Sequence, residues 1–240
     1  MHRLRFAMFL LFLGCWALAQ IPDKFENLKV LPKDISKKEM IEVMKSFTQS
    51  LGVRCNFCHV GEPGKPLSSY DFASDEPEHK EIARHMMKMV SDLNQNYFNP
   101  EKQAQAPQRV NCQTCHHGLA EPKTLTQVLN RTFEKKGIDE TVATYKKLKD
   151  RYYGRDSFDF SERSLLIFAE DLTTQQKWDE AITILKLNAE VYPEGTMTYT
   201  FLGECFAQKG DTAAAKQAYE KAVSLDPENR EAKEALEKLK

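Results

Sequence analysis

Two short runs of cysteine and histidine dominate the chemistry that this sequence can support. Cys55, Cys58 and His59 form the first run, and Cys112, Cys115 and His116 form the second. Two thiols three positions apart lie on one face of a helical turn, where each can add to a vinyl group of one porphyrin, and the next imidazole can bind the iron. Each run therefore predicts a covalent attachment site for one haem c.

Two other uses of paired cysteines stand beside this interpretation. Four thiolates in two pairs can hold a tetrahedral zinc ion, and an oxidising compartment favours disulfides. Neither use needs His59 or His116. The two pairs are also further apart in the sequence than is usual for zinc knuckles, so haem is the preferred reading.

A helix must precede the first run. Ser36 and Glu39 form a capping box, and Gly52 can end the helix in a left-handed conformation, which predicts a helix from about Lys37 to Leu51. Met44 lies in the middle of its apolar stripe. Because the chain turns back at Gly52, we expect Met44 to offer its thioether to the first iron, the alternative being that it only packs.

The second run is preceded by a similar pattern. We expect a helix that opens at Asp75, with Pro77 in its first turn and apolar residues at helical spacing over residues 82–97. Met86 lies near the centre of this stripe and is the expected sixth ligand of the second iron. His79 lies on the same face, so a second haem with two histidine ligands is the alternative.

The segments around these helices give weaker evidence for structure and for haem contacts. Residues 60–74 and 99–109 are rich in Pro, Gly, Ser and Gln, and we expect them to be surface loops that can cover a cofactor edge. Arg54, Arg84 and Arg109 flank the haem segments and could pair with propionates. Exposure to solvent is the commoner state of arginine and is expected for them.

Residues 1–19 have the pattern of a signal peptide. A positive start is followed by an apolar core too short to span a bilayer and by a small-residue cleavage signal at Ala19. We therefore expect an exported, periplasmic protein, in the compartment where haem c is attached. The residues before Cys15 loosely match a lipoprotein signal, so a lipidated Cys15 that associates with a membrane is the alternative.

Several segments together resemble a known family. They are Leu31-Pro32-Lys33-Asp34, Met44, Leu51-Gly52-Val53-Arg54-Cys55, Ala83-Arg84-His85-Met86 and Val110-Asn111-Cys112-Gln113-Thr114-Cys115-His116-His117-Gly118. Over about residues 28–120 the chain resembles the cytochrome subunit of photosynthetic reaction centres. The resemblance implies two units, each a Met-bearing helix, a turn and a Cys-x-x-Cys-His helix, with Met44 and Met86 as distal ligands. The photosynthetic members carry four haem motifs, whereas this chain has two.

The carboxyl half repeats itself. Pro193 and Pro227 are 34 residues apart, and small or apolar residues match under the same step, as in tetratricopeptide repeats (TPRs). The repeats run from about 162 to 195 and from 196 to 229, with a capping helix after them. Asn188 stands where the next repeat has Ala222, which is expected to weaken the first copy. We expect a surface that docks a protein partner.

These patterns predict an all-α chain with a dihaem cytochrome domain followed by a helical repeat domain. The expected boundaries are residues 1–19 for the signal peptide, 20–123 for the haem domain, 124–136 for a connecting helix and 137–240 for the repeats. The preferred function is electron transfer between a redox donor and an acceptor protein. A dihaem peroxidase and a scaffold that acts through its repeats are the alternatives. The net charge of −1 gives no basic excess for nucleic acid.

Overall fold

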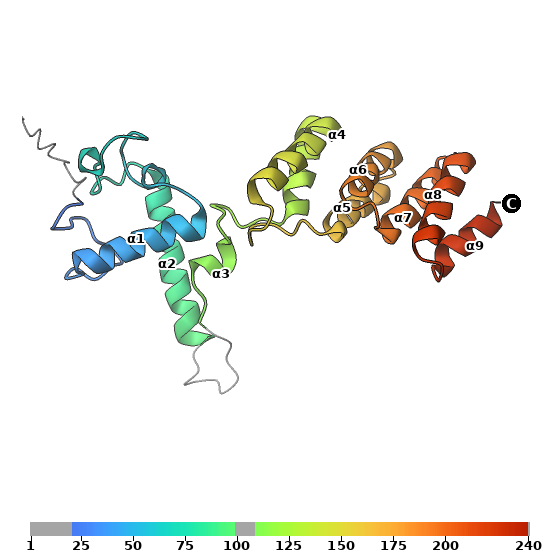
Figure 1. Cartoon of the computed structure of the whole chain (residues 1–240). Helices are drawn as coiled ribbons and strands as arrows, with labels where there is room; N and C mark the ends of the chain where they lie inside the picture. Colours follow the sequence, from blue (N-terminus) through green and yellow to red (C-terminus); the bar gives the residue numbers. More distant parts are fainter. Residues whose placement is uncertain (1–20, 99–108, 240) are drawn as a thin grey trace, which may run out of the picture. The chain divides into compact units, whose positions relative to one another are not determined.

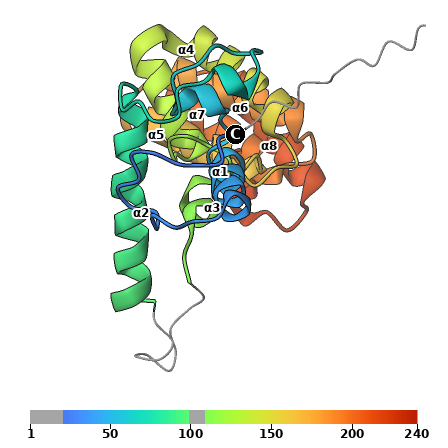
Figure 2. The same ribbon diagram turned by 90° about the vertical axis from the view of Figure 1, so that its left-hand side faces the viewer.

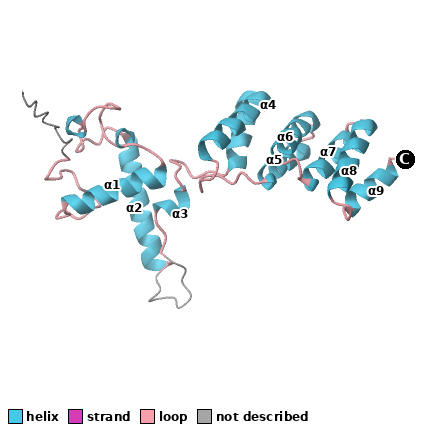
Figure 3. Cartoon of the chain, in the orientation of Figure 1, coloured by secondary structure: helices cyan, strands magenta, loops and turns pink. Residues whose placement is uncertain are grey.

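The computed structural model describes residues 21–98 and 109–239, and in these ranges the fold is helical with no strand beyond one isolated bridge (Figures 1 and 3). The chain divides into two compact units, residues 1–115 and 116–240. The predicted leader with Cys15, and most of the loop 99–109, lie outside the described residues. No helix in the described part combines the length and apolar character needed to cross a bilayer.

The first unit holds three helices that matter for the cysteine runs. They are α1 (Lys37–Leu51), α2 (Glu78–Asn96) and α3 (Cys112–His116), with short 3-10 turns η1 (Cys55–Phe57) and η2 (Leu67–Ser69) between α1 and α2. The helix α1 runs across the direction of α2 in Figure 1 and is seen nearly end-on in Figure 2, so the two helix axes point in different directions. The last residue of α3 begins the second unit.

The bounds predicted for α1 are confirmed. The Ser36 hydroxyl accepts a hydrogen bond from the Glu39 N–H at 3.3 Å, and the Glu39 carboxylate accepts from the Ser36 N–H at 3.0 Å. Gly52 follows the helix with φ of 65°, a left-handed conformation that a residue without Cβ adopts at little cost. Met40 is buried.

The start predicted for α2 is wrong by three residues. The helix begins at Glu78, and Pro77 precedes it in an extended conformation. Asp75 does not cap the helix, because its carboxylate lies 2.7 Å from the Lys29 ammonium and 2.8 Å from the Arg84 guanidinium. A residue before proline is also driven out of the helical region, so regular structure starts after Pro77.

The first unit has almost no apolar core of its own. Met40 is its only buried apolar side chain among the described residues. Polar contacts tie the segments together instead: the Asn27 amide donates to the Ala73 carbonyl at 2.7 Å, and Arg84 donates to the Asn27 carbonyl at 3.2 Å. A unit of this size needs another source of apolar burial to be stable.

The loop predicted between the first run and α2 is folded back on itself. Val60 and Asp71 form an antiparallel bridge, with the Asp71 N–H donating to the Val60 carbonyl at 2.9 Å. Tyr70 covers Gly61, where a Cβ would lie 2.3 Å from the tyrosine ring. The loop therefore has a fixed path, and Phe72 follows directly after the bridge.

The second unit begins with a kinked helix. The unit comprises α4 (Leu125–Tyr152), α5 (Glu162–Thr174), α6 (Trp178–Val191), α7 (Thr196–Gln208), α8 (Thr212–Leu225) and α9 (Arg230–Lys238). Thr124 and Gln127 form a capping box at the start of α4. Helical geometry breaks at Gly137, which has φ of 80° and ψ of −175°, so α4 consists of two helical stretches joined at a kink, and the connecting helix ends where the boundary at residue 136 predicts. Only glycine adopts this conformation readily.

The repeat pattern produces the expected helix pairs. α5 packs on α6 and α7 packs on α8, with α9 covering the end of the second pair. The matched small residues Ala169, Ala181 and Ala215 are fully buried. Gly203 is also buried, and a Cβ there would lie 2.5 Å from the Tyr219 ring, so this glycine allows α7 and α8 to approach closely.

Asn188, which stands where the next repeat has an alanine, donates two hydrogen bonds between the helices, while its side-chain oxygen is buried without a partner among the described residues. Its side chain is fully buried and donates to the Glu162 carbonyl at 3.1 Å and to the Thr198 hydroxyl at 2.9 Å. The Thr198 hydroxyl in turn donates to the Glu162 carboxylate at 2.6 Å. The amide thus links α5, α6 and α7, where an alanine would make none of these bonds.

Candidate haem-attachment sites

The first cysteine run forms one tight turn. The Cys55 carbonyl accepts hydrogen bonds from the Cys58 N–H at 3.2 Å and from the His59 N–H at 3.0 Å. In such a 3-10 turn, side chains three positions apart nearly eclipse, so both thiols project to the same side. Cys55 and Cys58 are free and partly buried. Burial, followed by the nearby Cys55, raises the pKa of the Cys58 thiol.

The loop that follows shapes the surroundings of His59. The Phe72 ring meets the His59 ring edge-on, with centroids 5.0 Å apart. Burial and the Lys80 charge lower the pKa of His59 to about 4, against an opposing effect of the Phe72 backbone. The imidazole is therefore neutral at physiological pH, which is the form that binds a metal. Its Nδ1 atom is buried without a hydrogen-bond partner in the described part of the chain.

The second run is a short helix with its own cap. The Asn111 side chain accepts from the Thr114 N–H at 3.1 Å, and the Thr114 hydroxyl accepts from the Asn111 N–H at 3.0 Å. This reciprocal pair fixes the first turn of α3. Burial raises the pKa of the Cys112 thiol, and Cys115 is exposed. The capping role of Asn111 and Thr114 is readable from their spacing but was not anticipated.

His116 is oriented by a backbone carbonyl. Its Nδ1 atom lies 2.8 Å from the Leu119 oxygen. Since a carbonyl can only accept, Nδ1 carries the proton and Nε2 keeps the lone pair that a metal needs. His117 and Gly118 have φ of 48° and 81°, and this left-handed pair reverses the chain so that Leu119 meets His116. His117 is exposed.

The alternative readings of the cysteines receive no geometric support. Among the described residues no group of three or more Cys, His, Asp or Glu side chains is placed to share a metal ion, so the two pairs do not converge on a common zinc site. The four cysteines are also free thiols rather than disulfides. Cys205 is a buried thiol in α7, where it packs in the apolar core.

The two expected methionine ligands lie on the helices predicted for them. Met44 is partly buried on α1. Met86 is 40% exposed on α2, and Ile82 and Met89 on the same helix are 46% and 45% exposed. The apolar stripe of α2 is therefore not covered by the protein's own side chains. Exposed apolar surface of this kind marks a binding face.

His79 lies beside the first run rather than the second. Its ring centroid is 3.9 Å from that of Phe57, which stands between Cys55 and Cys58. His85 is exposed and its Nδ1 lies 3.1 Å from the Glu81 carbonyl.

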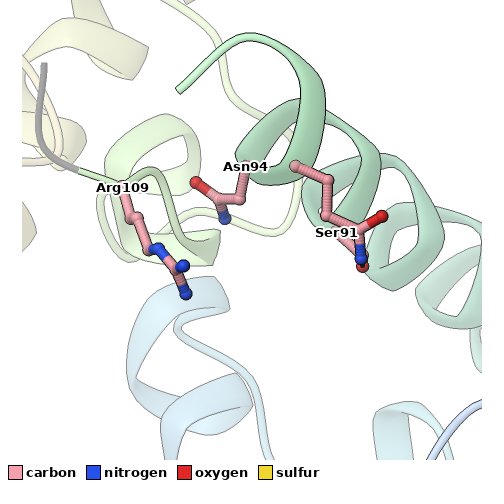
Figure 4. Close-up of a pocket in the computed structure, with 4 residues that line it drawn as sticks. Ser91, Asn94 and Arg109 are labelled. Atoms are coloured by element: carbon pink, nitrogen blue, oxygen red, sulfur yellow. Dashed lines mark hydrogen bonds between the residues drawn. The ribbon is translucent and has the colours of Figure 1, made fainter. Parts of the chain in front are cut away.

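The three flanking arginines differ from one another. Arg84 was expected to be exposed, but it is only 7% exposed because it bonds Asp75, Glu81 and the Asn27 carbonyl. Arg54 and Arg109 are exposed. Arg109 lines a shallow hollow of about 220 Å³ with Ser91, Asn94 and Gln95 (Figure 4).

The residues present fit two haem groups. Each run offers two thiols on one side of a turn and an imidazole able to bind iron through a free nitrogen. The first unit lacks apolar burial, while the stripe of α2 is left uncovered. Two large apolar rings would supply the missing core, since binding a prosthetic group contributes directly to folding.

Comparison with known proteins identifies the family. The family model described as photosynthetic reaction centre cytochrome C subunit matches residues 18–159, more than half of the chain, and the chain belongs to this family. The resemblance found in the sequence is thereby confirmed. A tetratricopeptide-repeat model matches residues 198–229.

Individual relatives match parts of the chain. The photosynthetic reaction center cytochrome c subunit of Roseobacter denitrificans is 33% identical over 105 residues, which are 43% of this chain and 26% of that protein. The chain thus matches about a quarter of this relative's length. The first TPR domain of human RPAP3 is 23% identical, with 48% of this chain and 86% of that chain covered and a TM-score of 0.34. The Sgt2 TPR domain of Aspergillus fumigatus is 19% identical, with 48% and 74% covered and a TM-score of 0.34.

Proposed function

We propose that this protein is a periplasmic dihaem c-type cytochrome that carries electrons between two redox proteins. The observation that carries the proposal is the pair of Cys-x-x-Cys-His turns in a unit that lacks an apolar core, each turn preceded by a Met-bearing helix. Haem c supplies one-electron exchange between ferrous and ferric iron. Family membership supports this assignment.

Different residues of the chain are proposed to attach, ligate and orient the two haem groups. Two thiols in each run form the covalent links: Cys55 and Cys58 in the first, Cys112 and Cys115 in the second. His59 and His116 are the proximal ligands. The Leu119 carbonyl fixes the tautomer of His116, and the Phe72 ring limits the rotation of His59.

Met44 and Met86 are proposed as the distal ligands. A thioether favours the reduced iron and raises the potential relative to a second histidine. Occupied sixth positions also leave no place for a substrate, which separates an electron carrier from a peroxidase. The contact of His79 with Phe57 supports Met86 over His79 for the second haem.

The repeats are proposed to dock a protein partner. In such folds the helix pairs form an extended binding surface.

We place the haem domain at residues 20–123, a connecting helix at 124–136 and the repeat domain at 137–240. Residues 1–19 are proposed to direct export and to be removed after Ala19. Retention of the chain on membranes, lost in Cys15→Ser, would instead indicate a lipid anchor.

A redox titration of the exported full chain tests the proposal. Two reversible one-electron steps are expected, with reduced spectra of low-spin haem c. The double change Cys112→Ala and Cys115→Ala should remove one step and leave the other, whereas Cys205→Ala should leave both. A chain that shows no reversible step, or that turns over peroxide at its irons, contradicts the proposed function.

A further inference from the structure

The Asn94 side chain makes a two-bond contact with the backbone just before the second cysteine run. Its amide group donates to the Val110 carbonyl at 2.8 Å, and its carbonyl oxygen accepts from the Val110 N–H at 2.9 Å. The side chain thus pairs with both backbone groups of one residue, as a neighbouring strand would. Only a carboxamide of this length offers the donor and the acceptor together.

The contact joins two segments that lie apart along the sequence. Asn94 is in the last turns of α2, and Val110 is 16 residues further along. Figure 4 shows Asn94 directed away from its helix toward the segment that carries Arg109. Val110 is followed by Asn111, which caps α3, so a chain of bonds leads from α2 to Cys112.

The other end of α2 is held as well. Arg84 bonds Asp75 and the Asn27 carbonyl, and Lys80 donates to the carbonyls of Phe72 and Ser74 at 2.9 and 2.6 Å. α2 is therefore anchored near its start to the loop beside His59 and near its end to the second run. Met86 lies between these anchors, eight residues or about 12 Å before Asn94 along the helix axis.

We propose that Asn94 is a positioning residue that sets the place of Met86 relative to the second haem. The proposal rests on Met86 being the sixth ligand of that haem. Loss of the Val110 contact frees the second run to shift against α2, and a thioether ligand tolerates little displacement. Asn94 is not itself a ligand in this proposal and acts on Met86 only through the Val110 contact.

The test uses the full holoprotein in a Met44→Ala background, so that the weak near-infrared band of methionine-ligated ferric haem reports on the second haem alone. Asn94→Ala should lose most of this band and should let the reduced protein bind carbon monoxide at a second haem. Asn96→Ala is the matched control, because Asn96 bonds only Asp92 on the exposed side of the same helix. It should leave the band unchanged.

A second variant keeps the proposal falsifiable if Asn94→Ala fails to fold. In Asn94→Asp the ionised carboxylate accepts from the Val110 N–H but repels the Val110 carbonyl, whereas the protonated acid has both a donor and an acceptor. The band should be weak at neutral pH and recover toward about pH 4, while the Met44→Ala parent changes little. The positioning role is overturned if Asn94→Ala keeps the band at the intensity of the Met44→Ala parent. It is also overturned if Asn94→Asp keeps that intensity at every pH. If Met86→Ala keeps the band, the ligand assignment fails instead.

Discussion

The ring of His79 in α2 lies against the ring of Phe57, with centroids 3.9 Å apart. Phe57 is a residue of the first Cys-x-x-Cys-His run. This contact occupies the one histidine that shares the apolar face of α2 with Met86. His79→Ala should therefore leave the near-infrared band of both haems at full intensity. The free energy of unfolding should fall slightly, because the contact with Phe57 is lost. Absorption spectra of the oxidised holoprotein measure this. Opening of one iron to carbon monoxide in His79→Ala would show that the histidine is a ligand.

Removal of either methionine ligand should open one iron. In Met44→Ala and in Met86→Ala, the near-infrared band should fall to about half and the reduced protein should bind one equivalent of carbon monoxide. The midpoint potential of the affected haem should fall, because the thioether no longer stabilises the reduced iron. Met89→Ala is the matched control, since Met89 is on the same helix and is about as exposed as Met86, at 45% against 40%, but is not an expected ligand. A Met89→Ala spectrum that changes as much as that of Met86→Ala would mean that the wrong methionine was assigned.

The close approach of α7 and α8 depends on Gly203. A Cβ at this position would lie 2.5 Å from the buried Tyr219 ring, so Gly203→Ala should destabilise the second unit by about 1–3 kcal/mol. Urea unfolding followed by circular dichroism measures the cost. In a Tyr219→Ala background the same change should cost much less, because the clashing ring is gone. Equal costs in the two backgrounds would exclude the contact as the cause.

The end of the repeat domain carries a pH-dependent carboxyl group. Burial, and then the neighbouring Glu231, raise the pKa of Glu204 from 4.5 to about 7. Glu204 and Glu231 line one hollow of about 640 Å³ with Glu234 and the charged groups of Arg230 and Lys238. An acid whose pKa is raised on folding binds more protons in the folded state, so the stability of this unit should fall as pH rises from 4.5 to about 7.

Urea midpoints at pH 5 and pH 7.5 test this expectation. Glu204→Gln should remove the part of the pH dependence that Glu204 causes, on the order of 1 kcal/mol after screening. Glu220→Gln, which changes an exposed carboxylate paired only with Lys216, is the control and should retain it. A Glu204→Gln profile that parallels the wild type would contradict the assignment.

Local patterns predicted much of the fold. The capping boxes at Ser36 and Thr124 fix helix starts by bonds within four residues, and the period between Pro193 and Pro227 gives the helix pairs. Such signals are visible in the sequence because the interacting groups are neighbours. The start of α2 was missed because Asp75 is engaged by Lys29, which is 46 residues away.

In the candidate haem sites, too, residues close in sequence could be predicted and contacts between distant residues could not. The Cys-x-x-Cys-His runs can be recognised from the sequence alone, because haem attachment depends on fixed short spacings. The supporting contacts cannot: Phe72 reaches His59 through a folded loop, and Asn94 reaches Val110 across residues that carry no regular pattern. The Leu119 carbonyl is a backbone group and has no side-chain signature at all. These partners depend on tertiary structure, and sequence spacing alone does not reveal them.

The mass of the exported, denatured chain tests the central claim most directly. After acid–acetone extraction, which removes haem that is not covalently bound, the chain should keep the added mass of two haem groups. Digestion should place one on the peptide with Cys55 and Cys58 and the other on the peptide with Cys112 and Cys115. A chain that carries no covalent haem, or only one, would contradict the account.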